Sequence, residues 1–237
     1  MADLTFKTAL RSLGASQKPS AGVSLYSRFV NRPLGRVLAA AAASARFSPN
    51  LVTALSALTT LAALAIVALV KVGVIAGLSV ALLLVLAFAL DSADGQVARL
   101  TGTGSLAGEW LDHVVDSGKM VAVHASVLIA AARQELLDAG WLLLPLAYMF
   151  VAVVLFSALT IFELLKRTRE TGPSTSRPPS LFRSIALLPA DYGVLCIAFA
   201  FWGAPAVFFP LYGFLFGCTT LITIALLTKW FRALRAV

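Results

Sequence analysis

Four aspartates stand out in a chain that is otherwise strongly apolar. Asp91 and Asp94 close one apolar stretch, and Asp112 and Asp116 lie at the start of the next. Insertion scales assign roughly 2.5 to 3.5 kcal/mol to each Asp at the centre of a membrane helix, so four unpaired carboxylates would cost on the order of 10 kcal/mol. A water-filled cavity or bound cations remove that cost, and oxygen ligands favour hard divalent ions such as Mg2+ or Mn2+. The four aspartates therefore predict a metal site.

The spacing of the aspartates indicates how they meet. On a helix, Asp91 and Asp94 are three residues apart and Asp112 and Asp116 are four apart, so each pair shares a face. Two such helices lying side by side form a four-carboxylate box that suits two cations about 3.5 to 4 Å apart. Paired metals of this kind stabilise the attacking and leaving oxygens of a phosphoryl displacement.

Residues between the two pairs favour the same chemistry. Gly95 and Ala98 keep the helix surface beside Asp94 small and leave room for a ligand against the backbone. Arg99 offers a planar fork for a phosphate. A run of glycines between the pairs loosens the turn and allows a close helix approach: Gly102, Gly104 and Gly108.

At these positions the chain resembles the CDP-alcohol phosphotransferases, also called CDP-alcohol phosphatidyltransferases. The matching segment is Asp91-x2-Asp94-Gly95-x2-Ala98-Arg99-x8-Gly108-x3-Asp112-x3-Asp116. The resemblance implies that all four aspartates bind two divalent cations, Mg2+ or Mn2+, which hold the pyrophosphate of a CDP-linked substrate. It also implies that Asp116 is the catalytic base, which takes a proton from an acceptor alcohol. The alcohol oxygen then attacks the phosphorus distal to cytidine and expels CMP.

The same resemblance supplies the predicted substrate contacts. The residues expected to bind the CDP group are Asn50, Thr53, Gly95, Ala98, Arg99, Ser105 and Gly108. For the acceptor, Lys119 lies on the face of Asp112 and Asp116, where it either touches an acceptor phosphate or pairs with Asp116. Arg183 is placed by the resemblance where some relatives contact a phosphorylated acceptor. His113 and His124 are expected to be packed or hydrogen-bonded residues and not ligands.

The acceptor itself has two interpretations. Lys119 and Arg183 favour phosphatidyl transfer from CDP-diacylglycerol to a polyol phosphate of the inositol phosphate or glycerol phosphate type. The alternative is transfer of a CDP-linked choline or ethanolamine head group to diacylglycerol, which Gly108-Glu109 and Asp112-His113 favour weakly. Outside enzymes, intramembrane acids are also typical of a divalent-cation transporter. A transporter has no need of Gly95, Ala98 and Arg99 at these offsets.

The composition predicts the elements that position these residues. The chain has 237 residues, of which 59% are hydrophobic and only 13% charged, and its mean hydropathy is +0.90. We therefore expect an all-α integral membrane protein. Six apolar stretches are long enough to cross about 30 Å of hydrocarbon. These expected spans cover 51–70, 73–90, 114–132, 141–165, 185–203 and 205–228.

Outside the spans the sequence predicts two further parts. Residues 1–22 are expected to form a mobile cytoplasmic tail, and residues 23–237 one membrane catalytic domain with its spans within 51–230. Within that domain, apolar and basic residues alternate over 24–47, which suits an amphipathic interfacial helix with an interruption at Pro33. Ser48 and Pro49 are expected to cap and open the first span.

Lys and Arg residues predict the orientation. They gather before the first span, between spans four and five, and in the C-terminal tail, which places both termini and the active site on the cytoplasmic side of a multi-pass plasma-membrane protein. The net charge of +8 lies mostly beside spans, where anionic headgroups attract it, so we expect no nucleic-acid partner. The resemblance implies a homodimer. Asp191, inside the fifth expected span, has no evident partner in the sequence.

Overall fold

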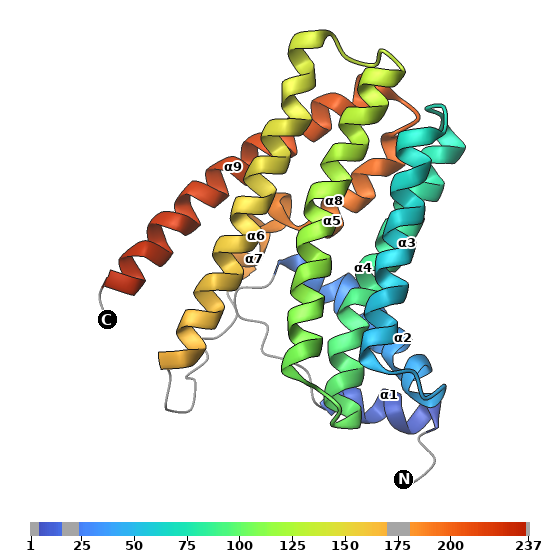
Figure 1. Cartoon of the computed structure of the whole chain (residues 1–237), viewed down its shortest axis with the longest axis vertical. Helices are drawn as coiled ribbons and strands as arrows, with labels where there is room; N and C mark the ends of the chain where they lie inside the picture. The colour runs from blue at the N-terminus through green and yellow to red at the C-terminus, as the bar shows by residue number, and fades with distance from the viewer. Residues whose placement is uncertain (1–4, 16–23, 170–180, 236–237) are drawn as a thin grey trace.

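Helices account for almost all of the fold. The computed structural model describes residues 5–15, 24–169 and 181–235, and these residues contain helices and turns but no strand. The helices longer than one turn are α1 (Phe6–Ala15), α2 (Arg32–Ser44), α3 (Pro49–Leu69), α4 (Val74–Thr101), α5 (Leu106–Arg133), α6 (Leu143–Arg169), α7 (Leu181–Ala186), α8 (Tyr192–Ala198) and α9 (Pro205–Arg235). A π-helix, Ser27–Asn31, leads into α2. In Figure 1, α1 lies at the lower end of the bundle, and α9 runs obliquely from the upper part toward the lower left.

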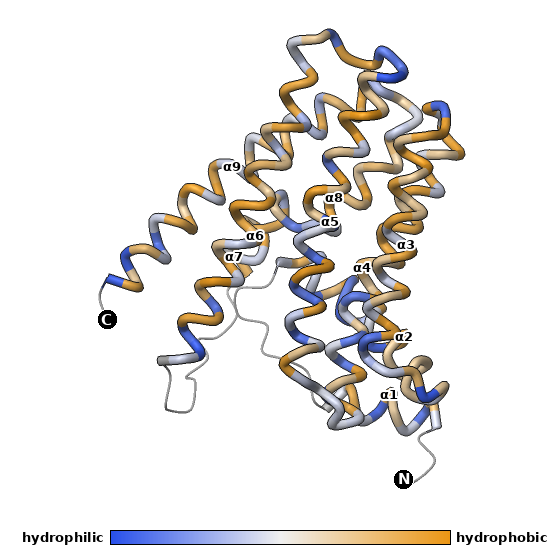
Figure 2. Tube along the Cα trace, in the orientation of Figure 1, coloured by the Kyte–Doolittle hydropathy of each residue, from blue (hydrophilic) through white to orange (hydrophobic). Residues whose placement is uncertain are grey.

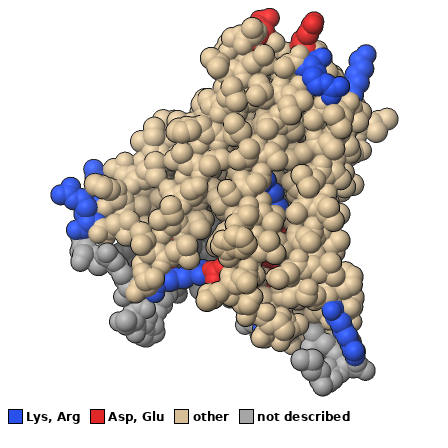
Figure 3. All heavy atoms as spheres, in the orientation of Figure 1, with Lys and Arg blue, Asp and Glu red and all other residues tan. Residues whose placement is uncertain are grey.

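The expected membrane architecture is confirmed. Within the described residues, five helical segments are long and apolar enough to cross a bilayer: Pro49–Leu69, Val74–Thr101, Leu106–Arg133, Ala139–Thr168 and Pro205–Arg235. Hydrophobic residues dominate the middle of the bundle, and hydrophilic residues gather at its two ends and along the lower parts of α4 and α5 (Figure 2). Charged side chains follow the same division on the visible surface (Figure 3). The aspartates therefore lie on helices that continue beyond the purely apolar stretches.

The fifth expected span is not one continuous helix, so its prediction over 185–203 is wrong in this respect. The chain forms α7, a 3-10 turn at Leu188–Ala190, the short helix α8 and a second 3-10 turn at Phe199–Phe201. Pro189 has no backbone N–H to continue a helix, and Asp191 caps the start of α8 with its side chain. The apolar part, Tyr192–Phe201, is shorter than the five spans. A total of six crossings remains a prediction.

Local sequence signals explain the boundaries around the aspartates. Ser48 Oγ accepts a hydrogen bond from Leu51 N at 3.2 Å and Pro49 is the first residue of α3, as expected. Gly102 ends α4 with a φ of +67°, a left-handed conformation that favours glycine. Ser105 Oγ accepts from Gly108 N at 3.0 Å and starts α5. The short turn between these caps connects α4 to α5, and both helices pack against α3.

The N-terminal region differs from the expected mobile tail. Of residues 1–22, the structure describes 5–15, and these form α1, whose Ala9 and Leu13 are buried against a cluster that includes Ala39 and Val97. The remainder of 1–22 lies outside the described residues. Phe6, Ala9, Leu10 and Leu13 have the i, i+3, i+4, i+7 spacing of an amphipathic helix. The prediction of a tail rested on the polar composition of the whole segment and missed this short periodic pattern.

The expected amphipathic helix over 24–47 is helical from Leu25 to Ser44. The π-helix precedes Pro33, and Pro33 then occupies the first turn of α2, where its missing N–H has no cost. Phe29 is 61% exposed, whereas Ala39, Ala40 and Ala42 of α2 are buried in the cluster that includes Ala93 and Val97 of α4. Gly35 makes a close approach, because an added Cβ would lie 2.8 Å from Ser92 Cβ of α4.

Candidate active site

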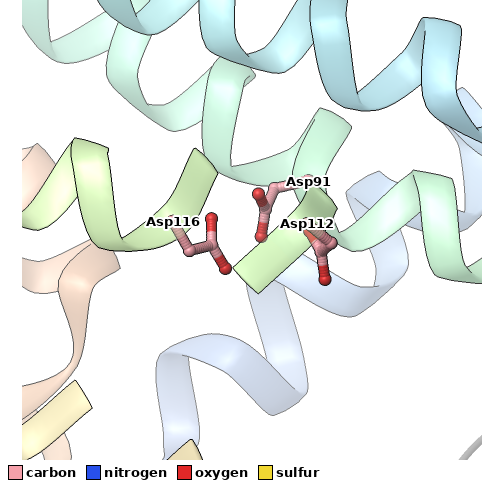
Figure 4. A group of neighbouring side chains, drawn as sticks. All are labelled: Asp91, Asp112 and Asp116. Atoms are coloured by element: carbon pink, nitrogen blue, oxygen red, sulfur yellow. The ribbon is translucent and has the colours of Figure 1, made fainter. Parts of the chain in front are cut away.

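Three of the four aspartates meet between α4 and α5. Asp91 comes from α4 and Asp112 and Asp116 from α5, and each offers a carboxylate oxygen within 4.8 Å of the others. Figure 4 shows the three carboxylates gathered in the space between the two helices. The helical spacing of Asp112 and Asp116 places both on the face that meets α4. Oxygen atoms at these separations are suited to a shared hard cation.

Asp94 is held apart from this group. It is buried, with 6% of its surface exposed, and its Oδ2 accepts a hydrogen bond from Thr53 Oγ1 of α3 at 2.6 Å. Its Oδ1 accepts from Gly95 N at 2.5 Å. The expected four-carboxylate box therefore appears as a group of three, with the fourth carboxylate oriented by α3.

Lys119 supplies the positive charge next to the group of three. Its ammonium is 7% exposed, forms ion pairs with Asp91 and with Asp116, the latter at 3.0 Å, and donates to Ser56 Oγ at 3.0 Å. Of the two roles considered for Lys119, the structure shows the pairing with Asp116 and adds Asp91. Such pairing offsets the cost of burying the carboxylates.

A polar cavity of about 570 Å3 opens on one side of the aspartates. It brings together every residue that the sequence predicts to bind the CDP group, and it also borders Asp94 and Asp112. The lining residues are Pro49, Asn50, Thr53, Asp94, Gly95, Ala98, Arg99, Thr103, Gly104, Ser105, Leu106, Gly108, Glu109, Asp112, His113 and Arg167. Gly108 allows a close approach here, because an added Cβ would lie 3.0 Å from Asn50 Oδ1. Glu109 pairs with Arg167 of α6 at the edge of this cavity.

A second cavity, the chamber, lies on the other side of the aspartates and has a volume of about 290 Å3. Its walls are mostly apolar and aromatic, and they come from six helices (α3, α4, α5, α6, α8 and α9) and the 3-10 turn at Leu188–Ala190. The lining residues are Thr60, Phe88, Asp91, Asp116, Lys119, Met120, His124, Tyr148, Ala152, Leu155, Phe156, Leu159, Ala190, Asp191, Tyr192, Leu195 and Thr219. Sequence reasoning missed most of these residues, since no motif joins positions so far apart.

Polar side chains of the chamber wall are hydrogen-bonded to one another. His124 Nδ1 lies 2.5 Å from Tyr212 Oη, and Tyr148 Oη lies 3.3 Å from Thr219 Oγ1. The prediction that His124 is a packed, hydrogen-bonded residue is confirmed. His113 packs edge-on against Phe156 with ring centroids 6.4 Å apart.

In the structure the Asp191 side chain has hydrogen-bond partners, which the sequence did not reveal. Its Oδ1 accepts from Gly193 N at 2.7 Å, and its Oδ2 accepts from Ser27 Oγ at 2.7 Å and from Ser24 Oγ. The backbone of Arg183 belongs to α7, but its side chain lies outside the described part of the structure. Its acceptor role therefore stays a prediction.

Comparison with known families decides how these cavities are interpreted. The sequence model of the family described as CDP-alcohol phosphatidyltransferase matches residues 46–231. The chain belongs to the CDP-alcohol phosphatidyltransferase family. A comparison with individual curated proteins found no match. The resemblance inferred from the motif is thus confirmed over most of the chain.

Membership of the CDP-alcohol phosphatidyltransferase family establishes the class of reaction. Family members are membrane transferases of substituted phosphate groups that use a CDP-alcohol donor and an alcohol acceptor. They also use divalent metals. The residues here fit such ions, because Asp91, Asp112 and Asp116 present only oxygen donors from two rigid helices. Asp94 and Asp112 line the polar cavity and Asp91 and Asp116 line the chamber, so the aspartates lie next to both cavities.

Proposed function

We propose that this chain transfers a substituted phosphate from a CDP-linked donor lipid or head group to an alcohol and releases CMP, with two divalent cations, Mg2+ or Mn2+, per active site. The observation that supports this most is the meeting of three motif carboxylates within 4.8 Å at the boundary of two cavities. When bound, the cations would be held by Asp91, Asp94, Asp112 and Asp116 and would neutralise charge on the pyrophosphate.

The CDP group binds in the polar cavity in this proposal. Arg99 offers a fork for phosphate oxygens, and Gly95 and Gly108 allow the ligand to approach the backbone. Asn50, Thr53, Ala98 and Ser105 complete the wall around it. Thr53 also orients Asp94 through their 2.6 Å hydrogen bond, so the site of the nucleotide and the metal-binding carboxylates are fixed together.

Asp116 acts as the base toward the chamber. It borders the chamber, and its Oδ1 receives a hydrogen bond from Lys119 at 3.0 Å, which fixes its orientation. The carboxylate takes the proton of the acceptor hydroxyl, the acceptor oxygen forms a bond to the phosphorus distal to cytidine, and the bond from that phosphorus to the CMP oxygen breaks. The proton remains on Asp116 until it is lost to solvent.

Two acceptor classes follow from different observations. The sequence favours a polyol phosphate acceptor with CDP-diacylglycerol as donor, because Lys119 and Arg183 offer positive charge. The chamber favours an uncharged lipid alcohol such as diacylglycerol with a CDP-linked choline or ethanolamine head group as donor. Lys119 is already paired with two carboxylates, and Asp191 adds a third acid to a wall that is otherwise apolar. Lys119 is the one Lys or Arg among the described residues that line the chamber, so a phosphate dianion would find no unpaired side-chain cation there.

An acceptor screen separates these assignments. Purified protein with Mg2+ or Mn2+ is given CDP-diacylglycerol with inositol phosphate or glycerol phosphate, and separately CDP-choline or CDP-ethanolamine with diacylglycerol, and CMP release is measured. Release in only the first set supports the polyol phosphate, and replacement of Arg183 by Ala should then raise the acceptor concentration required. Release in only the second set supports the lipid alcohol. No release in any mixture contradicts the enzyme proposal and leaves a divalent-cation transporter to be tested by ion flux.

We further propose a homodimer in the plasma membrane with the polar cavity and both termini on the cytoplasmic side. The orientation is supported by the distribution of Lys and Arg, which gather beside the predicted cytoplasmic ends of the spans. The homodimer is proposed from the family resemblance. Cysteine labelling of intact cells at residue 71 and at residue 232 tests the orientation. Labelling at 232 from outside would contradict it.

A further inference from the structure

Asp191 joins two parts of the molecule that are distant in sequence. One carboxylate oxygen accepts from Gly193 N at 2.7 Å and caps α8. The other accepts from Ser27 Oγ at 2.7 Å and from Ser24 Oγ, both at the start of the N-terminal helix formed by the π-helix and α2. Ser24 Oγ in turn accepts from Ser27 N at 3.2 Å and so begins that helix. We call these three side chains the latch.

The choice of Asp at this position is informative. An Asn, Ser or Thr side chain caps a helix about as well as Asp does, so capping alone does not require a charge. A carboxylate among apolar helices costs free energy unless its oxygens are hydrogen-bonded. Both serine hydroxyls donate hydrogen bonds to the second carboxylate oxygen of Asp191. The charge therefore serves the contact with the N-terminal helix more than the start of α8.

Aromatic packing supports the latch. The ring of Tyr26 is buried and stacks on Phe88 with centroids 6.2 Å apart, and Phe88 meets Tyr192 edge-on at 5.3 Å. Gly193 is required for this approach, because an added Cβ would lie 1.9 Å from Tyr26 Cε1. The N-terminal helix is thus fitted closely onto α8 and α4 at this point.

The latch lies against the chamber. Phe88 and Asp191 contact the N-terminal helix and also line the chamber. Tyr192, which packs on Phe88, lines the chamber too, as do Asp91 and Asp116. A shift of the N-terminal helix would move Tyr26 and, through Phe88 and Tyr192, that wall. The polar cavity shares none of these three wall residues.

We propose that Asp191 is a positioning residue for the acceptor side of the site: through Ser24 and Ser27 it fastens the N-terminal helix to α8 and thereby sets the shape of the chamber. This proposal rests on the proposed function, since it takes the chamber to receive the acceptor. The latch acts on the acceptor and leaves the nucleotide contacts of the polar cavity in place.

The test compares the full-length double variant Ser24→Ala/Ser27→Ala with Ser44→Ala. Ser44 lies in the same N-terminal helix, is exposed, and its hydroxyl donates to Ala41 O of its own helix at 2.8 Å. The double variant keeps the cap of α8 but removes both hydroxyls. We expect its KM for the acceptor to rise about tenfold, as for lost hydrogen bonds to a charged group, with the KM for the CDP donor and the metal requirement changed less than about twofold. Ser44→Ala should match the unchanged protein.

Two further measurements keep the test decisive. Ser27→Ala alone should show a smaller rise in acceptor KM, and it replaces the double variant if the latter does not fold. A merely structural role would lower the melting temperature and reduce all kinetic parameters together. If the double variant has an unchanged KM for the acceptor, or if its KM values for donor and acceptor rise equally, the proposed role of the latch is wrong. Absence of CMP release from the unchanged protein would instead overturn the proposed function itself.

Discussion

The polar cavity and the chamber are each lined by two of the four motif aspartates, but the two cavities are built in different ways. Most of the polar cavity comes from one continuous stretch, residues 94–113, with the start of α3 beside it. The chamber draws on residues from Thr60 to Thr219, spread over helices that are distant in sequence. A compact segment with fixed offsets suits a substrate part that stays the same, whereas a scattered wall changes with any one of many substitutions. Under the function proposed above, the nucleotide binds to the compact segment and the acceptor to the scattered wall.

The two regions also differ in what fixes them. Around the polar cavity, side-chain caps and glycines determine the backbone: Ser105 starts α5 and Gly102 ends α4. Around the chamber, packing and the broken helix near Pro189 determine the shape. Backbone-determined geometry is stiff, while an irregular helix surrounded by side chains adapts more readily.

The largest expected effect comes from replacing Asp116, one of the aspartates that lie next to the two cavities. Asp116→Asn keeps the size of the side chain but removes its basicity, so turnover should fall by about 10²- to 10⁴-fold, the usual contribution of a general base. Affinity for CMP, measured by calorimetry with Mg2+ present, should change little because the polar cavity is intact. Ser117→Ala, at the next position of the same helix, is the control. Full activity of Asp116→Asn would remove it from the role of base.

The second-largest effect is expected on the metal requirement of the enzyme. Asp91→Asn removes one charged oxygen from the group of three, and the Mg2+ or Mn2+ concentration for half-maximal activity should rise about tenfold or more. Chelation with EDTA should abolish CMP release from the unchanged protein, and added Mg2+ or Mn2+ should restore it. Activity that persists after exhaustive chelation would contradict a metal-dependent site.

The sequence predicted the two regions unequally for physical reasons. Helical offsets and glycine placement are local, so the motif around Asp94 and Asp112 was sufficient to expect a shared site. The partners of Asp191 are different: Ser24 and Ser27 lie more than 160 residues away, and no periodicity links them. Hydropathy also treated 185–203 as one span because Pro189 and Asp191 are single interruptions in an apolar stretch. Long-range packing decided that region.

A variant of Thr53 tests the role of the polar cavity separately from that of the chamber. Thr53→Val keeps the shape of the side chain but leaves Asp94 without its 2.6 Å hydrogen bond, and loss of a bond to a charged group corresponds to roughly a tenfold rise in the KM for the CDP donor. The acceptor KM should stay nearly constant. Thr59→Val is the matched control, because the Thr59 hydroxyl donates to the Leu55 carbonyl of its own helix and not to a carboxylate. A larger rise for the acceptor than for the donor would reverse the assignment of the two cavities.

The smallest effect is expected from filling the chamber. Ala152 of α6 is buried and lines the chamber, so Ala152→Phe places a ring in space that the acceptor needs, and overpacking of this kind typically costs about 1 to 3 kcal/mol. We expect the acceptor KM to rise about three- to tenfold with an unchanged KM for the CDP donor, measured by CMP release at varied acceptor. Ile161→Phe on the same helix is the control, since Ile161 is 56% exposed and does not line the chamber. Because Ala152 lies on no motif, a selective loss of acceptor binding there would show that the scattered wall determines the acceptor, and a selective loss of donor binding would assign the chamber to the donor instead.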